Sequence, residues 1–294
     1  MGLRTKPTYR QRRFGAEVRR LREQAGLSST DAAALLGLKQ PHLSNVEAGK
    51  TSLTPDRVRL LTAACGASST PFIEALNELG QQPGKGWWSD YRKILGEPHL
   101  DLAELEAGAV ALSSYEPTFI PGLLQTENYV RAMYRGGYAE ASPEEREAAI
   151  AFRMQRQSIL LGEPPTRLQT VIHEAALHAS LGDRDIMRGQ LLRLIEASRL
   201  PHVTIQILPF EGAVAFGTGF MVIEPSEPKL STALVSHIER DLYLEDEDSI
   251  AKYQGWFASL QGAALPPVDA AVSPESHAVK DSLGLIQRLL YPLL

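Results

Sequence analysis

Apolar and small residues recur through residues 28–50 at the spacing of two short helices that pack against each other. The positions in this pattern are Ala32, Ala33, Leu36, Leu38, Leu43 and Val46. Gly37 falls between its two halves, where a sharp turn favours a residue that reaches positive φ without a steric penalty. The pattern predicts two helices that cross at a steep angle. The second helix presents a polar set outward, namely Lys39, Gln40, His42, Ser44 and Asn45.

Further helix signals lie on both sides of this pair. A basic helix over residues 14–24 precedes it, with Val18 and Leu21 on its apolar side. After it, Thr54-Pro55 and Thr70-Pro71 each place an N-cap residue before a proline at the first helical position. We therefore expect a compact domain of five helices over residues 1–80, with a basic leader at its N-terminus.

Charge divides the chain more sharply than its net value of −5 suggests. Residues 1–64 carry 12 Lys and Arg against 5 Asp and Glu, whereas residues 65–294 carry 18 against 30. The basic end coincides with the paired helices, which suits a surface that meets phosphates and releases counterions. Double-stranded DNA is the partner that this combination predicts. A disordered basic leader followed by a solvated helix face is the alternative interpretation.

This N-terminal domain resembles the phage-repressor and Cro-like (Xre-type) helix-turn-helix domains. The resemblance covers roughly residues 12–80 and rests on positions in register with that pattern: Gly26, Gly37, Leu43, Val46, Glu47, Gly49 and Lys50. It implies that Gln40, Pro41 and Asn45 face base edges in the major groove. It also implies an ion pair between Arg22 and Glu47, which would keep the glutamate from repelling phosphate.

The chemistry of the side chains fits these assignments. Side-chain amides such as those of Gln40 and Asn45 can both accept from and donate to an adenine edge. Pro41 departs from the usual polar residue and offers only apolar contact, for example with a thymine methyl group. The residues expected near phosphates, three by the resemblance and two by their charge, are Ser29, His42, Lys50, Arg19 and Lys39.

A short polar segment separates this domain from the rest of the chain. Residues 81–86, Gln-Gln-Pro-Gly-Lys-Gly, have the composition of a linker, and a second, acidic domain over residues 87–294 follows. Trp87 and Trp88 open that domain. We expect them to anchor a helix in the core; a stacking surface for an aromatic effector is the alternative.

Helical and strand-like segments alternate in the second domain. Helices are expected at residues 99–113, 123–135, 142–161, 183–198, 249–260 and 273–290. Strands are expected at residues 115–120, 167–173, 203–208, 219–224, 233–238 and 241–244. We therefore expect a mainly α, multi-domain chain, in which an all-α domain of five helices precedes an α+β domain with a small antiparallel sheet.

Several strings in this domain resemble the large C-terminal domain of actinobacterial regulators of the WhiJ-like type. They are residues 116–132, 152–161, 171–196 and 203–212, and the resemblance spans nearly all of residues 87–275. It implies a regulator of development or antibiotic production, with a small companion protein that this domain binds. It carries no catalytic activity over to particular residues.

No pattern in the chain predicts an enzyme, a cofactor or a metal site. His173 and His178 are five residues apart, which places them about 140° apart around a helix. Cys65 is the only cysteine, which excludes a disulfide within the chain. Arg153 and Arg156 are expected on a solvated helix face; gripping a carboxylate or phosphate effector is the alternative.

The remaining expectations concern location and assembly. No apolar run reaches the roughly 18 residues that a membrane span requires, so we expect a cytoplasmic protein. We expect a homodimer, because paired domains read two half-sites about one helical turn apart. Two other classes stay open: a self-cleaving Ser-Lys repressor, and an antitoxin-like protein that neutralises a small companion protein through its final helix. The apolar seam of that helix is Val279, Leu283, Ile286 and Leu290.

Overall fold

The chain folds into two compact units, Met1–Leu105 and Glu106–Leu294. The computed structural model describes residues 7–67, 69–81, 86–136, 141–179, 181–211, 217–237, 241–271 and 280–294. The division falls later than the linker expected at residues 81–86, of which 82–85 lie outside the described stretches. Residues 87–105, expected in the second domain, belong to the first unit.

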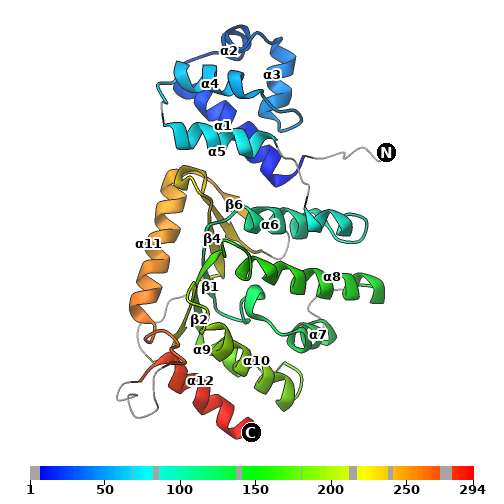
Figure 1. Ribbon diagram of the computed structural model, residues 1–294, viewed down its shortest axis with the longest axis vertical. Helices are drawn as coiled ribbons and strands as arrows, with labels where there is room; N and C mark the ends of the chain where they lie inside the picture. The colour runs from blue at the N-terminus through cyan, green and yellow to red at the C-terminus, as the bar shows by residue number, and fades with distance from the viewer. Residues whose placement is uncertain are drawn as a thin grey trace. The chain divides into compact units, whose positions relative to one another are not determined.

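The described part of the first unit consists of helices (Figure 1). In chain order they are α1 (Tyr9–Gln24), α2 (Ser29–Leu35), α3 (Gln40–Glu47), α4 (Pro55–Ala64), α5 (Thr70–Gln81), η1 (Trp87–Tyr91) and α6 (Glu97–Ala107), whose last two residues belong to the second unit. Helix α1 begins at Tyr9 rather than at Phe14. A capping box explains the earlier start, because the Thr8 and Gln11 side chains accept from each other's backbone N–H groups.

Arginines expected in a basic leader are tied into the first unit. Arg10 donates its Nε to a carbonyl oxygen at the C-terminus of α5 at 3.2 Å. Arg13 and Glu17 are both buried, and Arg13 Nη1 lies 2.5 Å from Glu17 Oε1. Asp101 of α6 accepts the first N–H of α1 at 3.0 Å and lies 3.3 Å from Arg12 Nη2. Much of the positive charge at this end is therefore compensated within the unit.

The second unit combines a sheet with helices. Its strands are β1 (Ala111–Glu116), β2 (Arg167–His173), β3 (Val203–Leu208), β4 (Phe220–Glu224), β5 (Thr232–Val235) and β6 (Leu242–Leu244). Its helical elements are η2 (Gly122–Leu124), α7 (Glu127–Arg135), α8 (Pro143–Arg156), η3 (Gln157–Leu160), α9 (Glu174–His178), α10 (Arg184–Ala197), η4 (Pro228–Leu230), α11 (Glu247–Ala263), α12 (Ser282–Leu290) and η6 (Tyr291–Leu293).

The described strands form one mixed sheet of six strands in the order β3-β2-β1-β4-β5-β6. The pairs β1-β2 and β2-β3 are parallel, whereas β1-β4, β4-β5 and β5-β6 are antiparallel. The expectation of an antiparallel sheet is therefore wrong. Helical crossovers connect β1 to β2 and β2 to β3, and a crossover brings the next strand back in the same direction. The predicted alternation of strands and helices already favoured parallel pairing.

The central strand occupies residues expected in a helix. Helix α6 ends at Ala107 instead of residue 113, and β1 begins at Ala111 instead of residue 115. β1 is hydrogen-bonded to β2 on one side and to β4 on the other. This pairing outweighs the local helical spacing of Ala109 and Leu112, on which the helix prediction depended.

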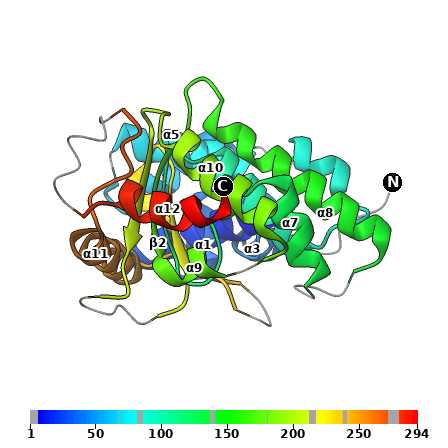
Figure 2. The same cartoon turned by 90° about the horizontal axis from the view of Figure 1, so that it is seen from below.

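Helices cover both faces of the sheet (Figures 1 and 2). On one face, Phe257 and Leu260 of α11 join a buried apolar cluster with Tyr115 of β1 and Phe220 of β4. Helices α7 and α8 lie on the other side of the sheet (Figure 2). The sheet is thus the middle layer of three.

The final helix packs within its own unit. Leu283, Ile286 and Leu290 of α12 are buried, and Ser282 Oγ accepts from the Ile207 N–H of β3 at 2.9 Å. The described part of the predicted seam therefore faces the interior of the unit. Val279, its fourth member, lies outside the described residues, as do residues 273–278 of the helix expected at 273–290.

Candidate nucleic-acid interface

Helix α3 separates its apolar residues from its polar ones. Leu43 and Val46 are buried where α3 contacts α1 and α2. The exposed side chains on the other face are Lys39, Gln40, Pro41, His42, Ser44 and Asn45. Pro41 lies in the first turn, where no intrahelical N–H bond is lost. The helix thus presents a mainly polar face to solvent, with one apolar ring near its start.

Close backbone approaches fix α3 against α1. A Cβ atom at Gly15 of α1 would lie 2.6 Å from two carbonyl oxygens at the end of α3, so a larger residue would push the helices apart. Gly49, directly after α3, adopts a φ of 72°, and a Cβ atom there would lie 2.7 Å from the Gln11 carbonyl oxygen. Gly37, in the turn before α3, has a φ of 61°. These glycines set the orientation of the exposed face.

Arg22 and Glu47 join the end of α1 to the end of α3. Arg22 Nε lies 2.6 Å from Glu47 Oε1, and Nη2 lies 3.4 Å from Oε2. Arg22 Nη1 also donates to the Leu27 carbonyl oxygen at 3.0 Å. Both side chains are largely buried, with 12% and 14% of their surface exposed. The pair therefore compensates the one carboxylate of α3 and stabilises the contact between the two helices.

Two of the residues expected at the DNA surface contact each other. The amide nitrogen of Gln40, expected at a base edge, lies 3.4 Å from Oγ of Ser29, expected near a phosphate. It also donates to Ser44 Oγ, one turn further along α3, at 3.0 Å. The Asn45 side chain is exposed and makes no hydrogen bond with the described residues. The Gln40 amide is therefore held by two serine hydroxyl groups, whereas the Asn45 amide is not held by any described residue.

The basic residues expected near phosphates differ in their surroundings. Lys39, His42 and Lys50 are exposed and form no ion pair with the described residues. Arg19 is exposed as well, but its Nε lies 2.8 Å from Glu23 Oε1, and this hydrogen bond raises the pKa of Arg19. Lys39 and His42 flank the start of α3, and Lys50 follows its end. The two lysines leave positive charge available beside the polar face.

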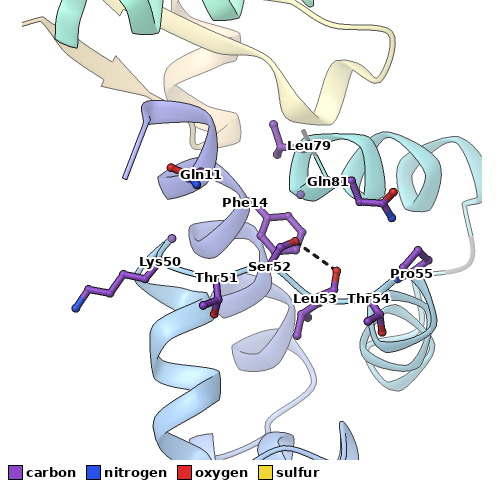
Figure 3. A pocket seen from close by; sticks show the side chains of 12 residues that line it. Gln11, Phe14, Lys50, Thr51, Ser52, Leu53, Thr54, Pro55, Leu79 and Gln81 are labelled. Atoms are coloured by element: carbon purple, nitrogen blue, oxygen red, sulfur yellow. Dashed lines mark hydrogen bonds between the residues drawn. The ribbon is translucent and has the colours of Figure 1, made fainter. Parts of the chain in front are cut away.

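A cavity of approximately 530 Å³ lies beside Lys50 (Figure 3). Phe14, Leu53 and Leu79 provide its apolar wall, and the Ser52 hydroxyl donates to the Leu53 carbonyl oxygen at 3.3 Å. Figure 3 shows the Lys50 side chain extending away from Phe14. The Lys50 ammonium group is thus directed outward rather than into the cavity.

Arg153 and Arg156, for which gripping an effector was the alternative to a solvated helix face, have different surroundings in the second unit. Arg156 is buried and paired with Glu106, with Nε 2.7 Å from Oε2 and Nη2 2.5 Å from Oε1. Arg153 is half-buried and donates from Nη1 to Gln125 Oε1 at 2.9 Å. Arg153 and Arg156 were both expected on a solvated helix face. This expectation is wrong for Arg156, because its guanidinium group is paired with Glu106 inside the core.

Glu116 lies within electrostatic reach of Arg153 and Arg156, and no local sequence pattern marks it as a functional residue. It is the last residue of β1, half-buried, and forms no hydrogen bond with the described residues. Loss of solvent raises its pKa to about 7, although the positive charges of Arg153 and Arg156 oppose the shift. A carboxyl group with a raised pKa at the carboxyl end of a central strand is a candidate for ligand contact.

The paired tryptophans belong to the first unit. Trp88 is buried, and its ring leaves no room for a side chain at Gly86. Trp87 packs edge-on against Trp88 and Tyr91, with ring centroids 5.9 and 6.1 Å apart. Trp88 thus anchors the short helix η1, and no open stacking face is formed by this ring.

The histidines of the second unit have local partners. His173 caps α9, because its Nδ1 accepts from the Ala175 N–H at 3.1 Å. His178 Nε2 lies 3.4 Å from Glu174 Oε1. Within the described ranges, no three His, Cys, Asp or Glu side chains gather in a way that could hold a metal ion.

No helix in the described part of the chain is both long enough and apolar enough to cross a bilayer.

The fold of the first unit and the polar face of α3 define a helix-turn-helix protein, which indicates a DNA-binding regulator. Residues 13–72 match a family described as a helix-turn-helix domain. Residues 100–272, more than half of the chain, match the domain of unknown function DUF5753, and the chain belongs to this family. No curated protein and no solved structure matches the chain.

Proposed function

We propose that this chain is a sequence-specific transcription regulator of the Xre type that reads DNA with helix α3. The exposed polar face of α3, fixed by close packing on α1, carries the proposal. Gln40 and Asn45 contact base edges in the major groove, and Pro41 contacts a thymine methyl group. Ser29, Lys39, His42, Lys50 and Arg19 lie near phosphates. The chain needs no cofactor and catalyses no reaction in this role.

Binding to selected DNA tests the proposal. Randomised duplexes are enriched on the full chain, and affinities for the selected site are measured by fluorescence anisotropy at two salt concentrations. Gln40→Ala and Asn45→Ala should each relax specificity at one base position, by about 1–3 kcal/mol. Lys50→Ala should weaken all sequences alike and reduce the salt slope by about one.

A distant amide provides the matched control. Gln155 lies on the exposed side of α8, so Gln155→Ala should leave both affinity and specificity unchanged. Failure to enrich any sequence would remove the proposed function. Unchanged specificity in both α3 variants would mean that another surface reads the bases.

We further propose that the second unit senses an acidic effector near Glu116 and Arg153. β1 lies where the strand order reverses, between β2 on one side and β4 on the other. In open α/β sheets, ligands bind outside the carboxyl ends of strands at such a point. Glu116 stands at that end of β1, and in its protonated form it does not compete with an anion for the Arg153 guanidinium group.

Thermal unfolding with simple anions tests this sensor role. Inorganic phosphate and glutamate are the two probes, and either should raise the melting temperature of the full chain. The rise should vanish in Arg153→Ala and persist in Arg193→Ala, a control arginine on the surface of α10 that pairs with Glu196. A melting temperature that neither probe changes would contradict an acidic effector at this place and favour a companion protein of the WhiJ-like kind.

The chain is proposed to act as a homodimer, because paired reading helices match two half-sites one helical turn apart. Sedimentation equilibrium of the full chain should give twice the mass of one 32.2 kDa chain. A single-chain mass both with and without the selected DNA would contradict this arrangement.

A further inference from the structure

The amide group of Gln40 is already engaged before any DNA is present. Its nitrogen donates to Ser44 Oγ at 3.0 Å and to Ser29 Oγ at 3.4 Å. A side-chain amide has two N–H donors and one carbonyl acceptor. Both donors therefore have partners, whereas Oε1 makes no hydrogen bond with the described residues. The exposed amide offers only an acceptor to a base.

The two serines come from elements that are fixed relative to each other. Ser44 lies one turn after Gln40 on α3, and Ser29 is the first residue of α2. Helices α2 and α3 pack against each other, and each buries an apolar residue, Ala32 on α2 and Leu43 on α3. This packing fixes the backbone positions from which Ser29 and Ser44 reach the Gln40 amide. Ser29 and Ser44 are therefore positioning residues for the amide.

Asn45 provides the contrast on the same helix face. Its side chain is exposed, and neither its donors nor its acceptor is used by the described residues. A free amide can pair in a bidentate way with N6 and N7 of adenine, which selects adenine alone.

We propose that Gln40 reads DNA through its carbonyl oxygen only, and that Ser29 and Ser44 impose this mode. The inference rests on the proposed DNA-binding function. In the major groove, adenine and cytosine each present an amino donor, whereas guanine and thymine present acceptors at the corresponding edge. The target sites are thus those with adenine or cytosine opposite Gln40, and the second amide, Asn45, selects adenine.

Base preference at one position tests this mode. The position read by Gln40 is the one at which Gln40→Ala loses its preference in the selected site. The full chain is then titrated with duplexes that carry each of the four bases there. Adenine and cytosine should bind within about threefold of each other, and guanine and thymine at least about tenfold more weakly.

Removing the serine hydroxyls should change the preference rather than abolish it. In the double variant Ser29→Ala/Ser44→Ala the amide donors are released, so adenine should gain about tenfold over cytosine through bidentate pairing. Ser29→Thr/Ser44→Thr keeps both hydroxyls and should keep the original ratio. Ser52→Ala removes a hydroxyl that bonds the Leu53 carbonyl oxygen instead, and should also leave the ratio unchanged.

Several results would overturn the inference. A preference for adenine alone in the unmodified chain would mean that the donors leave the serines on binding. A preference for guanine or thymine would mean that the amide presents its nitrogen. An identical ratio in the Ser-to-Ala variant would remove the positioning role. Each of these results leaves DNA binding intact, whereas failure to enrich any DNA would contradict the proposed function itself.

Discussion

The polar face of α3 and the polar region at the end of β1 use similar side chains in opposite ways. On α3, the amides and the basic groups are exposed, and most have no partner in the described residues. At the end of β1, Arg156 and Glu106 are buried in a two-bond ion pair, and Arg153 is tied to Gln125. A change on α3 should therefore affect recognition, whereas a change beside β1 should first affect folding.

Loss of the buried ion pair between Arg156 and Glu106 should produce the largest loss of stability. Glu106→Ala leaves the Arg156 guanidinium in a place where its side chain is only 10% exposed. Removing one partner of a buried ion pair costs about 3–5 kcal/mol, so unfolding of the second unit should occur at markedly lower urea concentration. Circular dichroism during urea titration measures the loss.

A surface arginine gives the matched control for that experiment. Arg131 contacts Glu127 and Glu147 with hydrogen-bond distances of 2.6 to 2.9 Å, but all three side chains are partly or largely exposed. Arg131→Ala should lower the urea midpoint far less than Glu106→Ala, because solvent screens exposed ion pairs. If the two variants unfolded at the same urea concentration, burial would not distinguish these ion pairs.

Glu116 should make stability fall as pH rises. The folded pKa is about 7, above the value of 4.5 for a free glutamate. Below pH 4.5 both states hold the proton, and the stability from this group is complete. Between pH 4.5 and 7 only the unfolded chain ionises, so up to about 2–3 kcal/mol is lost. Glu116→Gln should remove this loss when urea midpoints at pH 5 and pH 8 are compared.

Glu147 supplies a control of opposite sign. The hydrogen bond from Arg131 lowers the pKa of Glu147, so its contribution to stability is present above pH 4.5 and is lost as pH falls. Glu147→Gln should therefore remove a loss of stability that appears as pH falls below 4.5, which urea midpoints at pH 3 and pH 5 measure, whereas Glu116→Gln removes a loss that appears as pH rises. A slope that is equal in the parent chain and in Glu116→Gln would show that Glu116 ionises normally.

The sequence predicted the position of helix α3 well because its determinants are local. The spacing of Leu43 and Val46, the turn at Gly37 and the proline in the first turn all lie within a few residues of α3. The pairings of Arg13 with Glu17 and of Glu17 with Arg20 were also readable, since these residues are one helical turn apart. The charges of these arginines are therefore compensated within α1 rather than available to a partner.

The determinants of the second unit are separated along the chain, which is why they were missed. Glu106 of α6 and Arg156 of α8 are 50 residues apart in the chain and meet only in the folded unit, so no local pattern marks that encounter. The pKa of Glu116 depends on burial and on the charges of Arg153 and Arg156, so its sequence neighbours do not reveal it. Strand direction was missed for a different reason. The alternation of helices and strands already indicated parallel pairs, yet an antiparallel sheet was expected.

Arg22 offers the most discriminating test, with a loss of stability between those of the buried and the exposed ion pairs. Its pair with Glu47 is mostly but not fully buried, so Arg22→Ala should cost about 1–2 kcal/mol, between the buried and exposed cases. It should also weaken binding to every DNA sequence equally, because Glu47 then repels phosphate at the end of α3. Arg22→Ala/Glu47→Gln removes that charge and should restore affinity for every sequence. The base preference should be the same in the parent chain and in both variants. If affinity stayed low, the loss would come from displacement of α3, and the base preference at Gln40 and Asn45 would change with it.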